Sequence, residues 1–477
     1  MKCLYLSILA LSLCVFCRGQ DTVKSNFGKY YSVNQLKTDF VFFRTTLEKA
    51  HPSLYRYEFK DTIDYYFNQA QVKLDHPMNE LDFWKVLQTM VVKIESGHTH
   101  VSFADETIRQ LNLTPALLLP FTIYTEDNRL FIKRRARADD SLLKAGSEIL
   151  VINNERGTSI LQQMHSLESG DGYSNSFKDF RIEKEFNWLY NLLHGNQGQF
   201  LITVKYKGVI KTRLFKAAKV MPRTINPERL PSVSYPADMP NTAFLRVPDF
   251  VYKKEYESLH RQLFKDIKQH KAENLVIDLR DNPGGKTSVA ADLMGYFMTN
   301  DFKFTLADEM YVNPTFFKHL ADNTAKDMTI LHDIENINRQ LYREVYNDDV
   351  IQQTRMGSFK GNVYLLINGG TFSAAALFAA AVKQQRNCTI IGEETGGGAA
   401  GCDGGILVDV TLPNTRLKLH LPLFWTYAVN AKNDRGRGLL PDIRMTPEKN
   451  EKYFGAGLDP VIETLKEVIN TAANKTP

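Results

Sequence analysis

Residues 362–383 read NVYLLINGGTFSAAALFAAAVK, and this stretch decides the fold of the C-terminal half of the chain. Val363–Ile367 is a short unbroken apolar run, which is typical of a strand buried on both faces of a parallel sheet. Gly369 and Gly370 follow and allow a tight turn that bulky residues would resist. The alanine-rich run 374–381 then predicts a slim helix that packs closely on the sheet.

Ser373 lies at the turn between this strand and this helix. The start of a helix leaves backbone N–H groups free, and the positive end of its dipole favours a negative charge that develops there. A nucleophile elbow places a catalytic serine on the same strand, turn and helix, although GGTFSA is not the G-x-S-x-G motif. The alternative is that Ser373 only caps the helix. This segment by itself leaves both roles open.

The composition describes an ordinary globular protein of 477 residues, 43% apolar and 24% charged. At about 100–200 residues per domain, this length predicts two or three domains. The net charge of +5 is mild, and no basic run is interleaved with aromatic residues. We therefore expect no nucleic-acid partner.

The N-terminus carries the pattern of a secretory signal peptide. Lys2 precedes the apolar stretch 4–17, and a polar segment begins at Arg18. Residues 1–19 are therefore predicted to be a signal peptide, and the protein is expected to be exported, to the periplasm or outside the cell. The apolar stretch is shorter than the roughly twenty residues of a membrane span, and no later stretch approaches that length.

The cysteines raise two questions: whether the N-terminus carries a lipid anchor, and whether the mature chain contains a disulfide. Lipoprotein anchoring at Cys14 or Cys17 is less well supported, because the residues before them include bulky side chains where small ones are needed. The mature chain keeps Cys388 and Cys402, for which a disulfide is chemically allowed. Neither has the spacing of a metal site, so we expect no metal and no cofactor. The oligomeric state stays open.

Three regions follow the signal peptide. Residues 20–112 form a predicted helical region, because apolar side chains recur there at helical spacing. Residues 113–218 contain short strand-like runs and predict a β-rich module, either a spacer or a peptide-binding module that adds a ligand strand to a sheet edge. From 219 to 477 strands and helices alternate, which predicts a layered α/β domain.

The predicted strand 274–279 ends in RDNPGGKTS, which invites comparison with a phosphate-binding loop. That motif requires glycine where this chain has Arg280, and Pro283 removes a donor N–H group. The better use of Gly284 and Gly285 is to present backbone N–H groups to a substrate oxygen, which is an oxyanion hole.

Two segments, NLVIDLRDNPGG (274–285) and the run 366–398 around Ser373, closely resemble the signature of the C-terminal processing peptidases, also called tail-specific proteases. The order of parts is similar as well, and AGSEILVINN (145–154) is the best match to a PDZ-like module. The resemblance implies a ClpP/crotonase-like α/β serine peptidase domain preceded by a helical region and a PDZ-like β-rich module. It also implies that Ser373 attacks a peptide carbonyl while backbone N–H groups of Gly284 or Gly285 and of Ala374 hold the oxyanion.

The chain departs from many members of that family at the base. Their T-x-G-K-G lysine falls at Gly398, whereas SGHTH (96–100) resembles the G-H-T stretch of the tricorn-like Ser/His branch. That resemblance implies His98 as general base. For the carboxylate it offers Asp434, shortly before G-x-x-P-D, with Glu393 as the fallback.

We therefore expect an exported serine endopeptidase that acts on protein or peptide substrates. A histidine base with an ordinary pKa of about 6.5 predicts that kcat/KM rises with pH through an apparent pKa of roughly 6–7. The alternative is a catalytically inactive peptide-binding or scaffold protein of the same fold.

Overall fold

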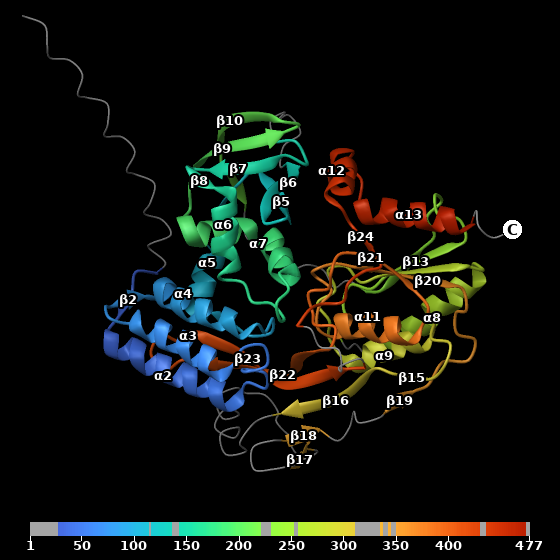
Figure 1. Ribbon diagram of the computed structural model, residues 1–477, viewed down its shortest axis with the longest axis horizontal. Coiled ribbons are helices and arrows are strands. Elements are labelled where there is room, and N and C mark those ends of the chain that lie inside the picture. The colour runs from blue at the N-terminus through green and yellow to red at the C-terminus, as the bar shows by residue number, and fades with distance from the viewer. Residues whose placement is uncertain are drawn as a thin grey trace, which may run out of the picture.

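The computed structural model describes residues 27–113, 116–135, 143–220, 230–251, 256–310, 334–336, 342–344, 350–429 and 436–473. The predicted signal peptide, residues 1–19, and Asp434 lie outside these residues. Figure 1 shows a helical region and a β-rich region on one side, and an α/β region with the C-terminal helices on the other.

A parallel sheet is the centre of the α/β region. The predicted strand and helix in 362–383 are confirmed as β20 (Asn362–Ile367) and α11 (Ala374–Gln385). β20 lies between β14 (Asn274–Asp278) and β21 (Thr389–Gly392), parallel to both. The sheet order is β12-β13-β14-β20-β21-β24, with β12 antiparallel to its neighbour. The outer strands are β12 (Ser232–Ser234), β13 (Thr242–Arg246) and β24 (Ile443–Arg444).

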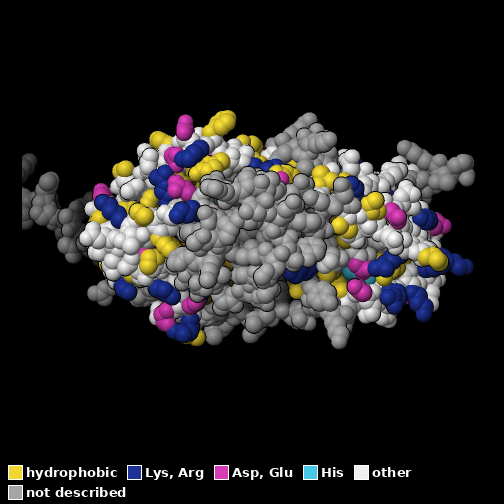
Figure 2. All heavy atoms as spheres, turned by 90° about the horizontal axis from the view of Figure 1, so that it is seen from below, with side chains coloured by type: hydrophobic (Ala, Val, Ile, Leu, Met, Phe, Trp, Pro, Cys, Tyr) yellow, Lys and Arg dark blue, Asp and Glu magenta, His cyan; other side chains and the backbone are white. Residues whose placement is uncertain are grey.

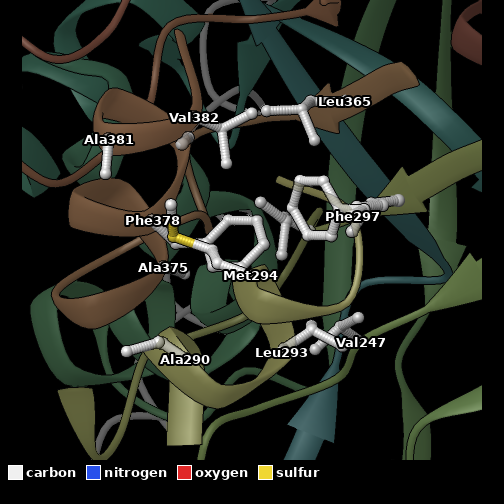
Figure 3. Packing of buried hydrophobic residues seen from close by; sticks show 14 of the residues in the cluster. Val247, Ala290, Leu293, Met294, Phe297, Leu365, Ala375, Phe378, Ala381 and Val382 are labelled. Atoms are coloured by element: carbon white, nitrogen blue, oxygen red, sulfur yellow. The ribbon is translucent and has the colours of Figure 1, made fainter. Parts of the chain in front are cut away.

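Helices cover both faces of this sheet, so the strands are apolar on both sides. Ile277 of β14 belongs to the core on the face of α11, whereas its neighbour Val276 belongs to the core on the opposite face. Figure 3 shows Phe378 of α11 packed with Met294 and Phe297 in the first core. The helices are α8 (Tyr256–Gln269), α9 (Thr287–Gly295) and α11 on one face, and α13 (Pro460–Ala473), after α12 (Pro447–Gly455), on the other.

The helical region shares its core with strands from the far end of the chain. The long hairpin of β22 (Gly401–Thr411) and β23 (Lys418–Ala428) packs its apolar side chains against these helices. β3 (His100–Ser102) pairs with β23, which places His100 opposite His420. The helices are α2 (Val33–Ala50), α3 (Lys60–Val72), α4 (Glu80–Val91), η2 (Val92–Ile94) and α5 (Asp105–Leu113).

The sheet that holds β22 and β23 extends from β23 to three further strands, and three short strand pairs lie elsewhere in the chain. This sheet adds β16 (Thr305–Met310), β18 (Tyr342–Glu344) and β17 (Ile334–Asn336). The short pairs are β1 (Tyr30–Tyr31) with β2 (Met78–Asn79), β4 (Ala116–Leu118) with β11 (Ala218–Val220), and β15 (Phe302–Lys303) with β19 (Ile351–Gln352).

The β-rich region contains an antiparallel sheet whose inner face is covered by two helices. Ile160 of α6 and Phe186 of α7 pack with the inward side chains of the strands. The strand-like runs in the sequence did not predict these two helices. The turn between them contributes to the site described in the next subsection. The elements are β5 (Phe121–Glu126), β6 (Arg129–Arg135), β7 (Glu148–Ile152), β8 (Glu155–Arg156), α6 (Gly157–His165), α7 (Ser176–His194), β9 (Gln199–Tyr206) and β10 (Val209–Lys216).

The surface seen in Figure 2 carries acidic and basic side chains in mixed order, with hydrophobic side chains scattered between them over its described part. Among the described residues, no helix combines the length and the apolar character that crossing a bilayer would need.

Candidate functional site

Ser373 has a strained backbone. Its φ of 51° and ψ of −128° lie in a region that L-residues rarely adopt, and such strain is typical of functional turns. The side chain makes no capping hydrogen bond to α11, so capping does not explain the serine. The hydroxyl lies near the thiol of Cys402 on β22, whose pKa burial raises and Ser373 acts to lower. The hydroxyl is therefore presented away from its own helix.

The loop after β14 holds this turn in place. Phe372 donates its amide to the carbonyl of Asn282 (3.0 Å), and the Thr371 hydroxyl donates to the carbonyl of Leu279 (2.9 Å). Thr371 and Asn282 are both completely buried. Two adjacent parallel strands thus end in loops that fix each other, which over-determines the conformation of Ser373.

Gly284 lies directly against the serine turn. Its φ is 96°, and a Cβ added there would come within 2.8 Å of both the Ala374 nitrogen and the Ser373 Cβ. The Gly284 amide already donates to Oδ1 of Asn282 (2.8 Å). Among the described residues, the amides of Gly285 and Ala374 make no such bond, so both are available for the expected oxyanion hole.

His98 lies beside the residue that precedes the serine. Its ring is 4.5 Å from the ring of Phe372, centroid to centroid, and Phe177 stacks on Phe372 at 4.0 Å. A side chain at Gly97 would collide with the Phe372 ring, so glycine is needed for this approach. The described hydrogen bonds do not include one between His98 and Ser373. The structure therefore brings His98 to the site without joining it to the hydroxyl.

The electrostatics of His98 favour the neutral imidazole. Burial, followed by the charges of His420 and His100, lowers the pKa of His98 to about 3. Its Nδ1 atom is buried and has no hydrogen-bond partner among the described residues. His100 stacks on His420 with ring centroids 4.6 Å apart.

Two carboxylates, Asp434 and Glu393, are expected from the sequence as the third residue. Asp434 lies outside the described residues, and Glu393 makes no described hydrogen bond to His98. The Glu393 side chain is exposed at the surface. Glu393 lines a cleft of about 1170 Å³ together with Arg280 and residues of the β-rich region. That cleft does not include His98, so Glu393 is a poor partner for the imidazole.

Asp171 is a site residue that sequence reasoning missed. Its carboxylate accepts hydrogen bonds from the amides of Gly97 (2.7 Å) and Gly398 (3.3 Å). Burial, followed by the charge of Asp403, raises its pKa to about 7. In sequence it stands only as an aspartate between two glycines, which indicates a turn and no partner.

The cysteines and the possible metal ligands give no further chemistry. Cys388 and Cys402 are free thiols, so the disulfide that the sequence allowed is absent. Within the described ranges, no group of three or more His, Cys, Asp or Glu side chains could hold a metal ion.

A second hollow, of about 480 Å³, opens beside His98. Its walls come from the helical region and from α7, and they are largely apolar. They include Trp84, Phe103, Leu167, Phe177 and Trp188.

Comparisons with known proteins match part of the chain to a peptidase family. Residues 241–445 match the model of peptidase family S41. The tail-specific protease of Haemophilus influenzae is 27% identical over 217 residues, which cover 45% of this chain and 26% of that protein. The chain therefore spans about a quarter of the length of this curated relative.

Solved structures show the same fold over most of the chain. Mature CPAF complexed with lactacystin has a TM-score of 0.65 at 15% identity, covering 92% of this chain and 99% of that one. Mature CPAF alone has a TM-score of 0.64 at 15% identity, with 93% and 99% covered. The fold and the serine turn thus define a multidomain protein with a serine-type peptidase domain. That domain includes residues 241–445, the segment similar to peptidase family S41.

Proposed function

We propose that this protein is an exported serine endopeptidase that hydrolyses peptide bonds of protein or peptide substrates. The observation that carries the proposal is the strained Ser373, whose hydroxyl caps nothing and whose turn is packed against Gly284. A structural serine would gain stability from relaxing this backbone, so the strain indicates a role for the hydroxyl.

The proposed reaction follows from the groups at the turn. As the Ser373 oxygen bonds to the substrate carbonyl carbon, the base takes the hydroxyl proton, and the carbonyl oxygen becomes an oxyanion. The amides of Gly285 and Ala374 hold that charge, while Gly284 shapes the turn. The base then returns the proton to the leaving amine as the C–N bond breaks. Water hydrolyses the acyl-enzyme by the same steps.

His98 is proposed as the base because the lysine alternative has no room. A Cβ at Gly398, the position of the family's lysine, would overlap the carbonyl oxygen of Gly401. The amide of Gly398 is also bound to Asp171. The His98 ring lies against that of Phe372 and no described hydrogen bond joins it to the Ser373 hydroxyl, so we expect substrate binding to reorient it.

Asp434 remains the proposed partner of the imidazole. The carbonyl of Gly436, two residues further on, accepts a hydrogen bond from the amide of Tyr173 (2.7 Å). Tyr173 follows the loop that binds Gly97, so the chain at 436 returns close to the His98 loop. The buried Nδ1 atom of His98, which has no partner among the described residues, is the group that Asp434 would bind.

The β-rich region is proposed as a PDZ-like gate or guide for the substrate. The cleft of about 1170 Å³ lies between it and the peptidase domain, with Lys133 and Arg134 on one side and Arg280 and Arg444 on the other. A polypeptide in this cleft could add its backbone to a sheet edge. The apolar hollow beside His98 would accept a large apolar side chain of the same substrate.

Labelling with a serine-reactive phosphonate tests this function, because only an activated serine reacts quickly. Wild-type protein should be labelled at Ser373, and Ser373→Ala should show neither labelling nor peptide hydrolysis. Ser358→Ala is a matched control, since Ser358 is buried but lies outside the site. A wild-type protein that binds peptides but is never labelled would instead support the inactive scaffold.

A further inference from the structure

The turn between α6 and α7, residues 166–175, forms three hydrogen bonds with residues 95–99, the His98 loop. The Ser169 hydroxyl donates to the carbonyl of Thr99 (2.7 Å), and the Gly172 amide donates to the carbonyl of Glu95 (2.9 Å). Between them, Oδ1 of Asp171 accepts from the amide of Gly97 (2.7 Å). Both flanks of His98 are therefore tied to one turn of the β-rich region.

This turn and Ser176, the first residue of α7, are also hydrogen-bonded to the peptidase domain. Oδ2 of Asp171 accepts from the amide of Gly398 (3.3 Å), and the Ser176 hydroxyl donates to the carbonyl of Glu394 (2.5 Å). The glycine loop that contains Gly398 lies against the nucleophile, because a Cβ at Gly397 would come within 2.9 Å of the Ser373 nitrogen. One carboxylate thus links the loop of the base to the loop beside the serine.

Asp171 is suited to this link by its chemistry. It is only 4% exposed, and each of its two oxygens accepts from a different loop. Asparagine would present one oxygen and one NH₂ group, so it could accept from only one of the two amides. A buried carboxylate near another one, Asp403, is costly, which argues that its two bonds serve a purpose.

We propose that Asp171 is a positioning residue of the serine site, whose carboxylate sets the spacing between the His98 loop and the glycine loop beside Ser373. It acts through these loops and touches no reacting atom. This role rests on the proposed peptidase function, but the link between the two loops does not.

The test combines amide hydrogen exchange with phosphonate labelling of the full chain. In Asp171→Ala, exchange at Gly97 and Gly398 should accelerate roughly ten- to hundredfold, the value of a hydrogen bond to a charged group. Asp171→Asn, which is nearly isosteric, should accelerate only one of the two amides. In both variants the maximal labelling rate at Ser373 should fall roughly tenfold or more, with the phosphonate concentration for half-maximal rate unchanged.

Asp39→Asn is the matched control. Asp39 is also fully buried and accepts backbone amides from a distant turn, at Asn414 and Thr415, but it lies in the helical region. It should reduce stability without changing exchange at Gly97 or the labelling rate.

The outcomes separate the two proposals. Unchanged exchange at either loop in Asp171→Ala overturns the link, whatever the labelling shows. Faster exchange with an unchanged labelling rate overturns the positioning role, because the spacing would then not matter to Ser373. A wild-type protein that is never labelled refutes the peptidase function and the positioning role, while the exchange data still decide whether Asp171 joins the loops.

Discussion

Replacing Ser373 by glycine should make the protein more stable than replacing it by alanine, although both variants lose the nucleophile. The φ of 51° and ψ of −128° cost a residue with a Cβ about 1–3 kcal/mol, which alanine retains and glycine avoids. Glycine loses more backbone entropy on folding, at about 0.5–1 kcal/mol. The difference in unfolding free energy should therefore be about 0.5–2 kcal/mol in favour of Ser373→Gly.

Urea unfolding followed by fluorescence measures this difference, with the same transition compared between variants. Ala375→Gly is the control, because Ala375 is completely buried one residue inside α11. There glycine loses helix propensity, about 1 kcal/mol, and a buried methyl group, about 0.8 kcal/mol, so it should destabilise the protein. If Ser373→Gly is instead less stable than Ser373→Ala, the turn is not strained and the argument for a functional serine fails.

Four further predictions concern the base, the oxyanion hole and the N-terminus. His98→Gln should lower kcat/KM by roughly 10²–10⁴-fold, whereas His100→Gln should change it only a few-fold; the reverse result would make His100 the base. Because burial and the charges of His420 and His100 lower the pKa of His98 to about 3, the imidazole takes up its proton only at more acid pH. In the surroundings described for His98, the acid limb of kcat/KM should therefore lie below the midpoint of roughly 6–7 that the sequence alone predicts, whereas a midpoint at or above about 6.5 would show that a carboxylate such as Asp434 raises the His98 pKa. Gly284→Ala should abolish hydrolysis, because its Cβ would collide with the serine turn. The control Gly404→Ala, with no atom within 4 Å of the added Cβ, should remain active. Equal rates of the two variants would show that the serine turn can move to accommodate a side chain at residue 284. Mass spectrometry of the exported protein should find a chain that begins near Gln20, and an intact Met1 or an acylated cysteine would exclude the predicted cleavage.

Local sequence was sufficient for the elements whose signal is local. The apolar run, the glycine pair and the alanines around Ser373 each act on their immediate neighbours, so strand, turn and helix were predicted correctly. The use of the two oxyanion glycines was not predictable in detail. Only the tertiary structure shows that the Gly284 amide already donates to Asn282, which is why Gly285 and Ala374 are the proposed donors.

The sequence by itself determined that a serine at a helix start, a glycine-rich strand end and a G-H-T stretch are present. It could not determine how these segments meet, because the serine lies 89 residues after Gly284 and 275 after His98, and no periodicity in a sequence encodes such contacts. The tertiary structure decided that Gly97 lets His98 lie on Phe372 and that Gly398 has no space for lysine. It also decided that Asp171, an ordinary turn residue in sequence, accepts amides from both loops, because hydrogen bonds of this kind depend on distances set by packing and not on local propensity.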